Sequence, residues 1–178
     1  TRYSPQNSIK QVVSRENNVS GALKSQVDYV YDDYGNPTTV TIKDENRDIV
    51  ISTQYGVTYN GGFPTSQSIA ATNAAGVTET IKQQMEYTKL TGEMTKFIDP
   101  KGYTTTYQYD KLGRMVKVVN PDTSFSTATY QDALNQVTVV DPTGVSTLTK
   151  WNPFGWKISS GIVGKGSEKY GYDSYGRL

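Results

Sequence analysis

Polar and apolar residues alternate singly along much of the chain, as in half-buried β-strands. In "GRMVKVVN", Val116 and Val118 share one face, while Met115, Lys117 and Val119 share the other. In "YTTTYQY", residues 103–109, every second residue is Tyr or Thr. Clusters of Asp, Pro and Gly bound these runs, which are about six or seven residues long. The pattern therefore predicts a series of short β-strands.

Two turn signals separate the predicted strands: Tyr-Asp-x-x-Gly and Asp-Pro-x-Gly. Both fit a type I turn in which the Asp carboxylate accepts backbone N–H groups and Gly takes a left-handed conformation followed by a bulge. The first signal gives the structural turn residues Asp32, Gly35, Asp110, Gly113, Asp173 and Gly176. The second gives Asp99, Pro100, Gly102, Asp141, Pro142 and Gly144. We expect the two kinds of turn to lie on opposite edges of one sheet.

Landmarks recur at intervals of 21 residues in the second half of the chain. Asp99-Pro100 and Asp141-Pro142 bracket Asn120-Pro121 at that interval, and an aromatic residue recurs at the strand ends. The resulting aromatic ladder comprises Tyr31, Tyr87, Tyr109, Tyr130, Trp151 and Tyr172. We expect these rings to stack on one another across strands.

The repeat predicts an all-β fold: an antiparallel meander of roughly a dozen or more strands that forms a curved strip. We expect one domain over residues 1–178, with irregular copies in 1–86 and regular copies in 87–178. A helix over Thr80 to Leu90 is the alternative there, but its place in the repeat favours a strand. A long hairpin is expected to turn around Asn17 to Gly21.

The composition agrees with a β-protein and limits the kinds of functional site that the chain can form. Thr (23) and Tyr (14) far outnumber Leu (6), and the former two favour strands. The net charge of +1 gives no basic excess for nucleic acid. Cys and His are absent, which removes thiolate ligands and the commonest general base. We therefore predict no enzyme activity, no cofactor and no metal site. The sequence contains no run of about 18 apolar residues, so no membrane-spanning segment is predicted.

The Tyr-Asp-x-x-Gly-Arg strings at Tyr109 to Arg114 and at Tyr172 to Arg177 resemble the YD repeats of the Rhs family. That family includes wall-associated polymorphic toxins, the C components of Tc toxins and teneurins. The resemblance covers roughly residues 27–178 and implies a segment of a β-strip that spirals into a hollow shell. It also implies a large secreted or cell-surface bacterial protein whose shell encloses a C-terminal toxin.

Other interpretations of single motifs remain. Asp141 to Val145 is similar to the self-cleavage motif of Rhs shells, but the earlier copy at Asp99 favours a turn. Residues 43–48 hold three carboxylates that could bind Ca²⁺, although a solvated hairpin tip is favoured. Paired carboxylates for glycoside hydrolysis are not excluded by spacing. The alternative function is a carbohydrate-binding or adhesive cell-wall module, with Tyr59, Phe63 and Trp156 as candidate glycan-binding residues.

The expected partners are further YD repeats of the same polypeptide and an enclosed C-terminal domain, with cell-wall or surface glycans under the alternative function. We interpret the chain as a piece of a longer protein. Excision would leave unpaired edge strands near Ile9 to Val13 and Glu168 to Tyr172, so we expect the isolated piece to self-associate.

Overall fold

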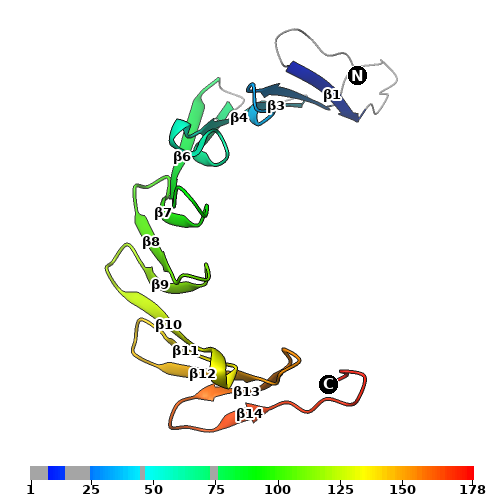
Figure 1. Cartoon of the computed structure of the whole chain (residues 1–178). Coiled ribbons are helices and arrows are strands. Elements are labelled where there is room, and N and C mark those ends of the chain that lie inside the picture. Colours follow the sequence, from blue (N-terminus) through cyan, green and yellow to red (C-terminus); the bar gives the residue numbers. More distant parts are fainter. Residues whose placement is uncertain (1–7, 15–24, 45–46, 73–75) are drawn as a thin grey trace. The chain divides into compact units, whose positions relative to one another are not determined.

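The computed structural model describes residues 8–14, 25–44, 47–72 and 76–178, and these contain fourteen β-strands and two short 3₁₀ helices (Figure 1). The chain divides into two compact units, residues 1–103 (unit 1) and residues 104–178 (unit 2). The predicted all-β antiparallel fold is confirmed. The predicted hairpin tip at Asn17 to Gly21 lies outside the described residues.

Unit 1 is an open antiparallel sheet in which each strand pairs with the next along the chain. Its elements are β1 (Ser8–Ser14), β2 (Ser25–Tyr31), β3 (Pro37–Asp44), β4 (Arg47–Tyr55), η1 (Val57–Tyr59), β5 (Pro64–Thr72), β6 (Thr78–Tyr87) and β7 (Met94–Ile98). The strand β6 occupies the segment for which a helix was the alternative, so the preference for a strand there is confirmed.

Unit 2 has the same organisation, with shorter strands. Its elements are β8 (Thr104–Tyr109), β9 (Met115–Val119), β10 (Phe125–Gln131), η2 (Asp132–Leu134), β11 (Gln136–Val140), β12 (Ser146–Trp151), β13 (Lys157–Ile162) and β14 (Ser167–Lys169). Regular 21-residue spacing in the sequence thus becomes two strands and two turns per repeat.

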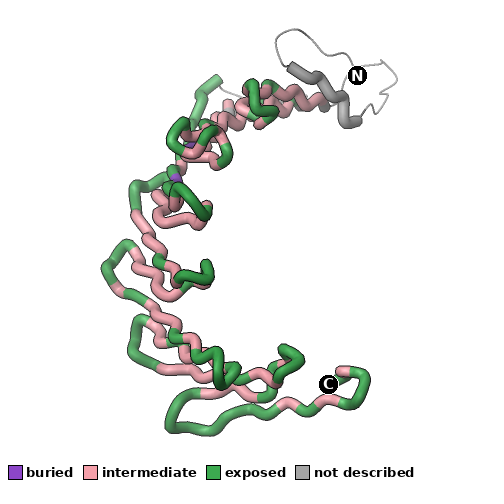
Figure 2. Tube along the Cα trace, viewed as in Figure 1, coloured by how far each residue is buried: buried purple, intermediate pink, exposed green. Residues whose placement is uncertain are grey.

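The residues whose burial is described form no ordinary hydrophobic core in either unit. Among the residues whose burial is described, only Met85 and Ser66 are buried, with 7% and 6% of their surface exposed (Figure 2). Strand residues are mostly half-buried because each sheet is a single layer of hydrogen-bonded strands, and the described residues form no second layer on it. Stability must therefore come from neighbouring strands and from the turns.

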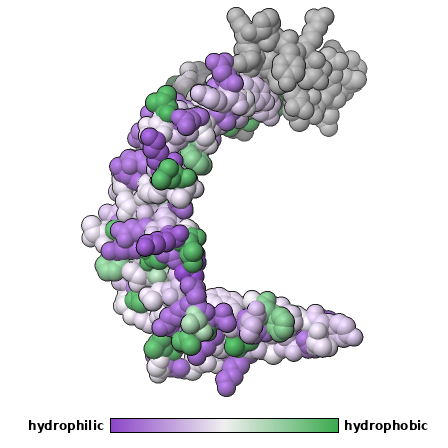
Figure 3. All heavy atoms as spheres, viewed as in Figure 1, coloured by the Kyte–Doolittle hydropathy of each residue, from purple (hydrophilic) through white to green (hydrophobic). Residues whose placement is uncertain are grey.

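The unit 1 sheet nevertheless has two chemically different faces. The pairing register places one apolar residue from each of five successive strands in a row: Tyr29, Val40, Ile51, Ile69 and Ile81. The opposite face is more polar, and there Lys43 forms an ion pair with Asp28 at 3.3 Å. Hydrophobic and hydrophilic residues are interspersed on the visible surface of the described chain (Figure 3). The sheet is thus amphipathic although it is only one layer thick.

The strand ends form two sides of each sheet, and we call these two sides its edges. The turns alternate between the two edges because the strands follow one another in a meander. In unit 2, the turns at Asp110 and Asp173 lie at one edge, together with the turn at Asn152, and the turn at Asp141 lies at the other. In unit 1, the turn at Asp32 likewise lies opposite the turn at Asp99. We call the edge with the Tyr-Asp turns the YD edge. The predicted separation of the two turn kinds holds within each unit.

The opposite edge of unit 2 contains two turns with the same backbone hydrogen bonds and different fourth residues. The Gly144 N–H donates to the Asp141 carbonyl at 3.0 Å, and the Thr123 N–H donates to the Asn120 carbonyl at 3.0 Å. Both fourth residues have positive φ, +86° for Gly144 and +70° for Thr123. A β-branched residue is strained in this conformation, whereas glycine is not.

Exchanging the two fourth residues should therefore change stability in opposite directions. Gly144→Thr should lower the free energy of unfolding by about 1 kcal/mol, because no atom lies within 4 Å of an added Cβ and only backbone strain acts. Thr123→Gly should raise the free energy of unfolding by roughly 0.5 kcal/mol, since relief of strain exceeds the entropy gained by the unfolded chain. Urea denaturation of the two variants measures both changes, and equal signs would contradict the assigned turn geometry.

Candidate functional site

Three turns at the YD edge of unit 2 are each built around one side-chain oxygen. In the turn at Asp110, that carboxylate accepts the N–H of Leu112 at 2.9 Å and the N–H of Arg114 at 3.0 Å. Asp173 accepts the two equivalent N–H groups, both at 2.9 Å. At Asn152 the side-chain amide oxygen makes the same two bonds at 3.0 Å. An acceptor at this position is therefore what the turn requires, and Asn can replace Asp.

The remaining predicted turn residues occupy equivalent places. Asp32, Asp99 and Asp141 each accept the N–H two residues ahead and the N–H four residues ahead. The predicted turn glycines all have positive φ: Gly35, Gly102, Gly113, Gly144 and Gly176. Pro100 and Pro142 follow their Asp residues, where the fixed φ of proline suits the turn.

Arg114 joins its own turn to the next turn on the YD edge. Its Nε donates to Asp110 at 2.8 Å, and its two terminal nitrogens donate to Asp132 at 2.5 and 3.2 Å. The face of the guanidinium lies over the Tyr130 ring, 4.1 Å from the centroid. Two carboxylates and an aromatic ring thus hold one arginine, which spans from β9 to the end of β10.

The hydroxyl group of Tyr130 makes a second contact across the same pair of strands. The ladder of β8 and β9 shifts register where Tyr109 faces Met115, which marks a β-bulge. The Tyr130 hydroxyl donates to the Met115 carbonyl at 3.3 Å. A bulge disrupts the regular ladder locally, so the tyrosine satisfies a backbone group at the irregular position.

The same construction recurs 42 residues later with a different side chain. Trp156 follows the turn glycine, as Arg114 does, and packs on the Tyr172 ring with centroids 5.2 Å apart. The Tyr172 hydroxyl donates at 3.0 Å to the carbonyl of Lys157, where β12 and β13 shift register. An added Cβ on Gly176 would lie 2.8 Å from Trp156, so the indole also contacts the next turn. We call each such contact between successive turns on the YD edge an edge latch.

Unit 1 uses other residues for the same purpose. Asn36, the residue after the turn glycine, donates to the Gly61 carbonyl in the η1 loop at 2.9 Å. Further along this edge, the rings of Tyr59 and Phe63 pack on Tyr87 at 5.7 and 5.0 Å. The Tyr87 N–H donates to the Tyr59 hydroxyl at 3.1 Å. Burial raises the pKa of the Tyr87 hydroxyl, with Tyr59 adding to the shift.

The predicted direct stacking of the aromatic ladder is wrong for Tyr130 and Tyr172, whose rings pack on Arg114 and Trp156. Equivalent residues lie two strands apart, roughly 10 Å, which is too far for ring contact. Tyr31 stacks on Tyr29 of its own strand at 6.0 Å. Of the other ladder residues, Tyr87 packs in the cluster with Tyr59, and Tyr109 lies opposite the bulge in β9. The backbone N–H of Trp151 donates to the Asn135 carbonyl at 2.9 Å.

Of the residues after the turn glycines, sequence reasoning missed Arg114, and it assigned Trp156 to glycan binding and not to a contact between turns. A usable signal exists, because in each of the two pairs Arg114–Tyr130 and Trp156–Tyr172 the aromatic residue follows 16 positions later. The predicted glycan-binding residues contact other aromatic side chains: Tyr59 and Phe63 each other, and Trp156 both Phe154 and Tyr172.

The hydrogen bonds made by the turn residues fit a structural role. The Asp141 carboxylate is engaged by the Thr143 hydroxyl at 2.7 Å and by two backbone N–H groups, which agrees with a turn more than with a self-cleavage site. In the described part of the chain, no three residues among Asp, Glu, Cys and His gather as a metal site. The tip at residues 45–46, in the segment considered for Ca²⁺, lies outside the described residues. No helix within the described ranges is long and apolar enough to cross a membrane.

Comparison with known proteins gives a family match over one part of the chain. Residues 90–124 match the RHS Repeat family. A comparison with curated proteins gave no match. Among solved structures, the chain is similar to one in the "Crystal Structure of TcdB2-TccC3-Cdc42", with 13% sequence identity and a TM-score of 0.42. That alignment covers 96% of this chain and 12% of the other, so this chain spans a small part of the length of its neighbour.

Removing a latch hydroxyl should weaken unit 2 measurably. Tyr172→Phe should lower the free energy of unfolding by about 1 kcal/mol, since the Lys157 carbonyl loses its donor at 3.0 Å. Tyr130→Phe should cost less because its bond is longer, 3.3 Å. Tyr170→Phe is the matched control, because that hydroxyl donates to the exposed Glu168 carboxylate. Urea denaturation with no difference between Tyr172→Phe and the control would contradict the latch.

Stability should fall on acidification because turn carboxylates have lowered pKa values. The Arg177 N–H and side chain lower the pKa of Asp173, and the Thr143 hydroxyl with the Val145 N–H lowers that of Asp141. A lowered folded-state pKa adds stability above the ordinary value of 3.8 that is lost as pH falls through the folded-state pKa. The urea midpoint should therefore be lower at acid pH than at neutral pH.

The Asp173→Asn variant controls this pH dependence. Asn152 shows that an amide oxygen accepts the same two N–H bonds, so the variant should keep its turn and lose one titrating group. Its urea midpoint should change less between neutral and acid pH than that of the unaltered chain. An identical change in both proteins would show that Asp173 does not contribute.

Proposed function

Starting from the RHS repeat at residues 90–124, we propose that the chain is a structural segment of the wall of a large bacterial shell protein, which encloses a C-terminal toxin. This proposal rests on one observation: the chain that matches the repeat family also has edge latches between successive turns. Each latch joins one turn to the next turn on the same edge, so further repeats can be added without a new core.

The amphipathic single-layer sheet also suits a wall. A wall segment has two large surfaces that meet different surroundings, and unit 1 has an apolar row on one face and the Asp28–Lys43 pair on the other. A globular enzyme domain would instead bury its apolar face against a second layer. Only Met85 and Ser66 are buried among the residues whose burial is described.

The proposal extends to partners and location. The main partner is the remainder of the same polypeptide, as further repeats and as the enclosed C-terminal domain. The whole protein is secreted or displayed on the bacterial cell surface and acts in competition between bacteria or in attack on a host. The segment itself is not an enzyme and needs no cofactor, since its role is to hold a surface in place.

Limited proteolysis of the natural protein that contains this chain tests the proposal. We expect a hollow particle by electron microscopy and a C-terminal domain that resists protease until the shell is opened by denaturant. Cleavage of the C-terminal domain at the same rate as a free domain, without a hollow particle, would contradict a shell.

Carbohydrate binding is the second candidate, favoured by one exposed aromatic group. Phe154 is 79% exposed and packs beside Trp156, with ring centroids 5.5 Å apart. Sugar rings stack on such faces. Titration of Trp fluorescence with cell-wall fragments should show a saturable change that Phe154→Ala abolishes. A flat titration would exclude this site as a sugar platform.

A further inference from the structure

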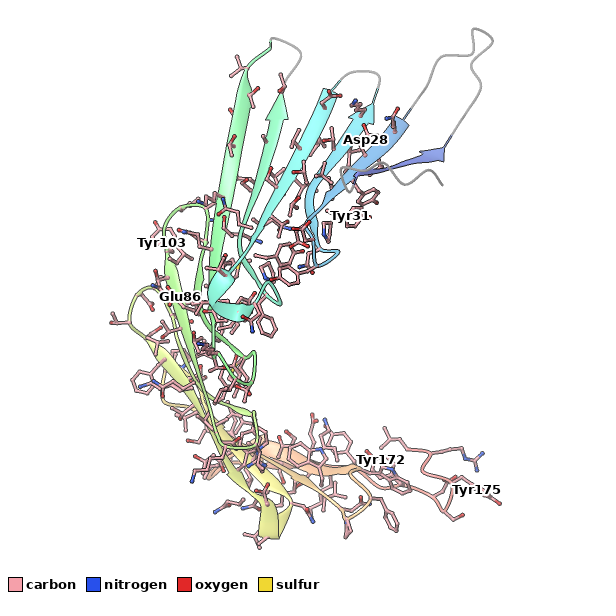
Figure 4. All side chains as sticks on the ribbon, turned by 45° about the horizontal axis from the view of Figure 1, so that its top comes forward. Asp28, Tyr31, Glu86, Tyr103, Tyr172 and Tyr175 are labelled. Atoms are coloured by element: carbon pink, nitrogen blue, oxygen red, sulfur yellow. The ribbon has the colours of Figure 1, made fainter. Side chains whose placement is uncertain are left out.

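The turns on the YD edge of unit 2 share a large apolar residue at their third position. Each of these turns closes with a hydrogen bond from the N–H of its fourth residue to the carbonyl of its first. Their third residues are Leu112, Leu134, Phe154 and Tyr175. Leu112, Leu134 and Phe154 are 72%, 61% and 79% exposed, and Tyr175 lies on the segment that follows β14 (Figure 4). A large apolar side chain thus stands at every turn of this edge in unit 2.

The geometry of the turns does not require these apolar residues. On the opposite edge of unit 2, turns with the same closing hydrogen bond have Asp122, Thr143 and Gly164 at the third position. A type I turn is compatible with most residues there, and small polar residues are common in such turns. The most exposed large hydrophobic residue of the opposite edge is Val163, at 56%, which stands at the second position of its turn. The apolar third residues therefore need an explanation other than folding.

The edge latches hold the turns in a row and leave their apolar tips outside. Arg114 and Trp156, which follow the turn glycines, pack back on tyrosine rings. Leu112 and Phe154, which precede the same glycines, stay exposed. Successive turns on one edge lie two strands apart, roughly 10 Å, so the tips form a line of separate apolar groups. A lipid surface suits such a line better than a protein partner does, because lipids rearrange around each tip while a protein interface is packed like a protein interior.

Charge differs between the two edges and favours an anionic surface at the YD edge. Exposed lysines lie beside the apolar tips, Lys111 in the first turn and Lys150 before the third. The two carboxylates of the neighbouring turns are both engaged by Arg114. The turns of the opposite edge contain two carboxylates and one lysine: Asp122, Asp141 and Lys165. Lysines next to apolar side chains are the combination that binds membranes with anionic headgroups.

We propose that the YD edge of unit 2 binds the surface of an anionic phospholipid bilayer. Leu112, Leu134 and Phe154 enter the boundary between the headgroups and the acyl chains, where their apolar surface leaves water. Lys111 and Lys150 contact lipid phosphates. Trp156, whose ring lies 5.5 Å from that of Phe154, is a residue type that favours the bilayer interface. This contact rests on the edge alone and is independent of what the faces of the sheet enclose.

Flotation of the intact 178-residue chain with phospholipid vesicles tests the site. We expect binding to phosphatidylcholine vesicles that contain about 30% phosphatidylglycerol, and weaker binding to phosphatidylcholine alone or at high salt. Leu112→Thr and Phe154→Thr introduce the residue that Thr143 provides in the same place at the opposite edge, so both turns should be kept. Each variant should bind the anionic vesicles about tenfold more weakly, because one apolar tip is lost.

Matched variants at the opposite edge separate this site from general stickiness and from charge attraction. Val163→Thr also removes an exposed apolar side chain and should leave binding unchanged. Lys111→Gln should weaken binding to the anionic vesicles, whereas Lys165→Gln should not. Urea denaturation checks that every variant is folded. Absence of vesicle binding, or equal binding by Leu112→Thr and Val163→Thr, would overturn the proposal.

Discussion

The contact between one turn and the next turn along the YD edge is the interaction on which the structure of each unit depends. A single-layer sheet has no core to fix its strands, and register could slip where both faces are half-exposed. Arg114 and Trp156, each at the start of one strand, prevent this by packing on a tyrosine at or just beyond the end of the next strand. Each latch fixes the position of a returning strand relative to the turn that began the pair.

The latch explains why the repeat combines tyrosine, aspartate and glycine. Aspartate accepts the turn N–H groups, and glycine provides the positive φ that places the next residue over the edge. The tyrosine ring receives that residue, and its hydroxyl satisfies a carbonyl at the bulge, as Tyr172 does for Lys157. Each residue type therefore serves one step of the same construction. Variation is tolerated where the chemistry is preserved, as at Asn152.

Much of this fold can be predicted from sequence because its determinants are local. Adjacent residues encode the turns at Asp110 and Asp173 and the alternation in β9. The strands, the turns and the edge at which each turn lies can therefore be predicted from them. The latches could not be predicted in the same way, because Arg114 and Asp132 are 18 positions apart and only the strand register unites them. Direct stacking of the tyrosines was the wrong expectation because equal spacing in sequence placed them two strands apart.

Edge latches, more than burial, hold the strands of unit 2. Residue-resolved amide hydrogen exchange tests it with matched bonds. At the YD edge, Asp110 and Asn152 donate their N–H to turn carbonyls at 2.9 Å, and at the opposite edge Asn120 and Asp141 do so at 2.8 and 3.0 Å. We expect slower exchange at Asp110 and Asn152, because latches must open first. Equal exchange at both edges, or faster exchange at the YD edge, would contradict the account.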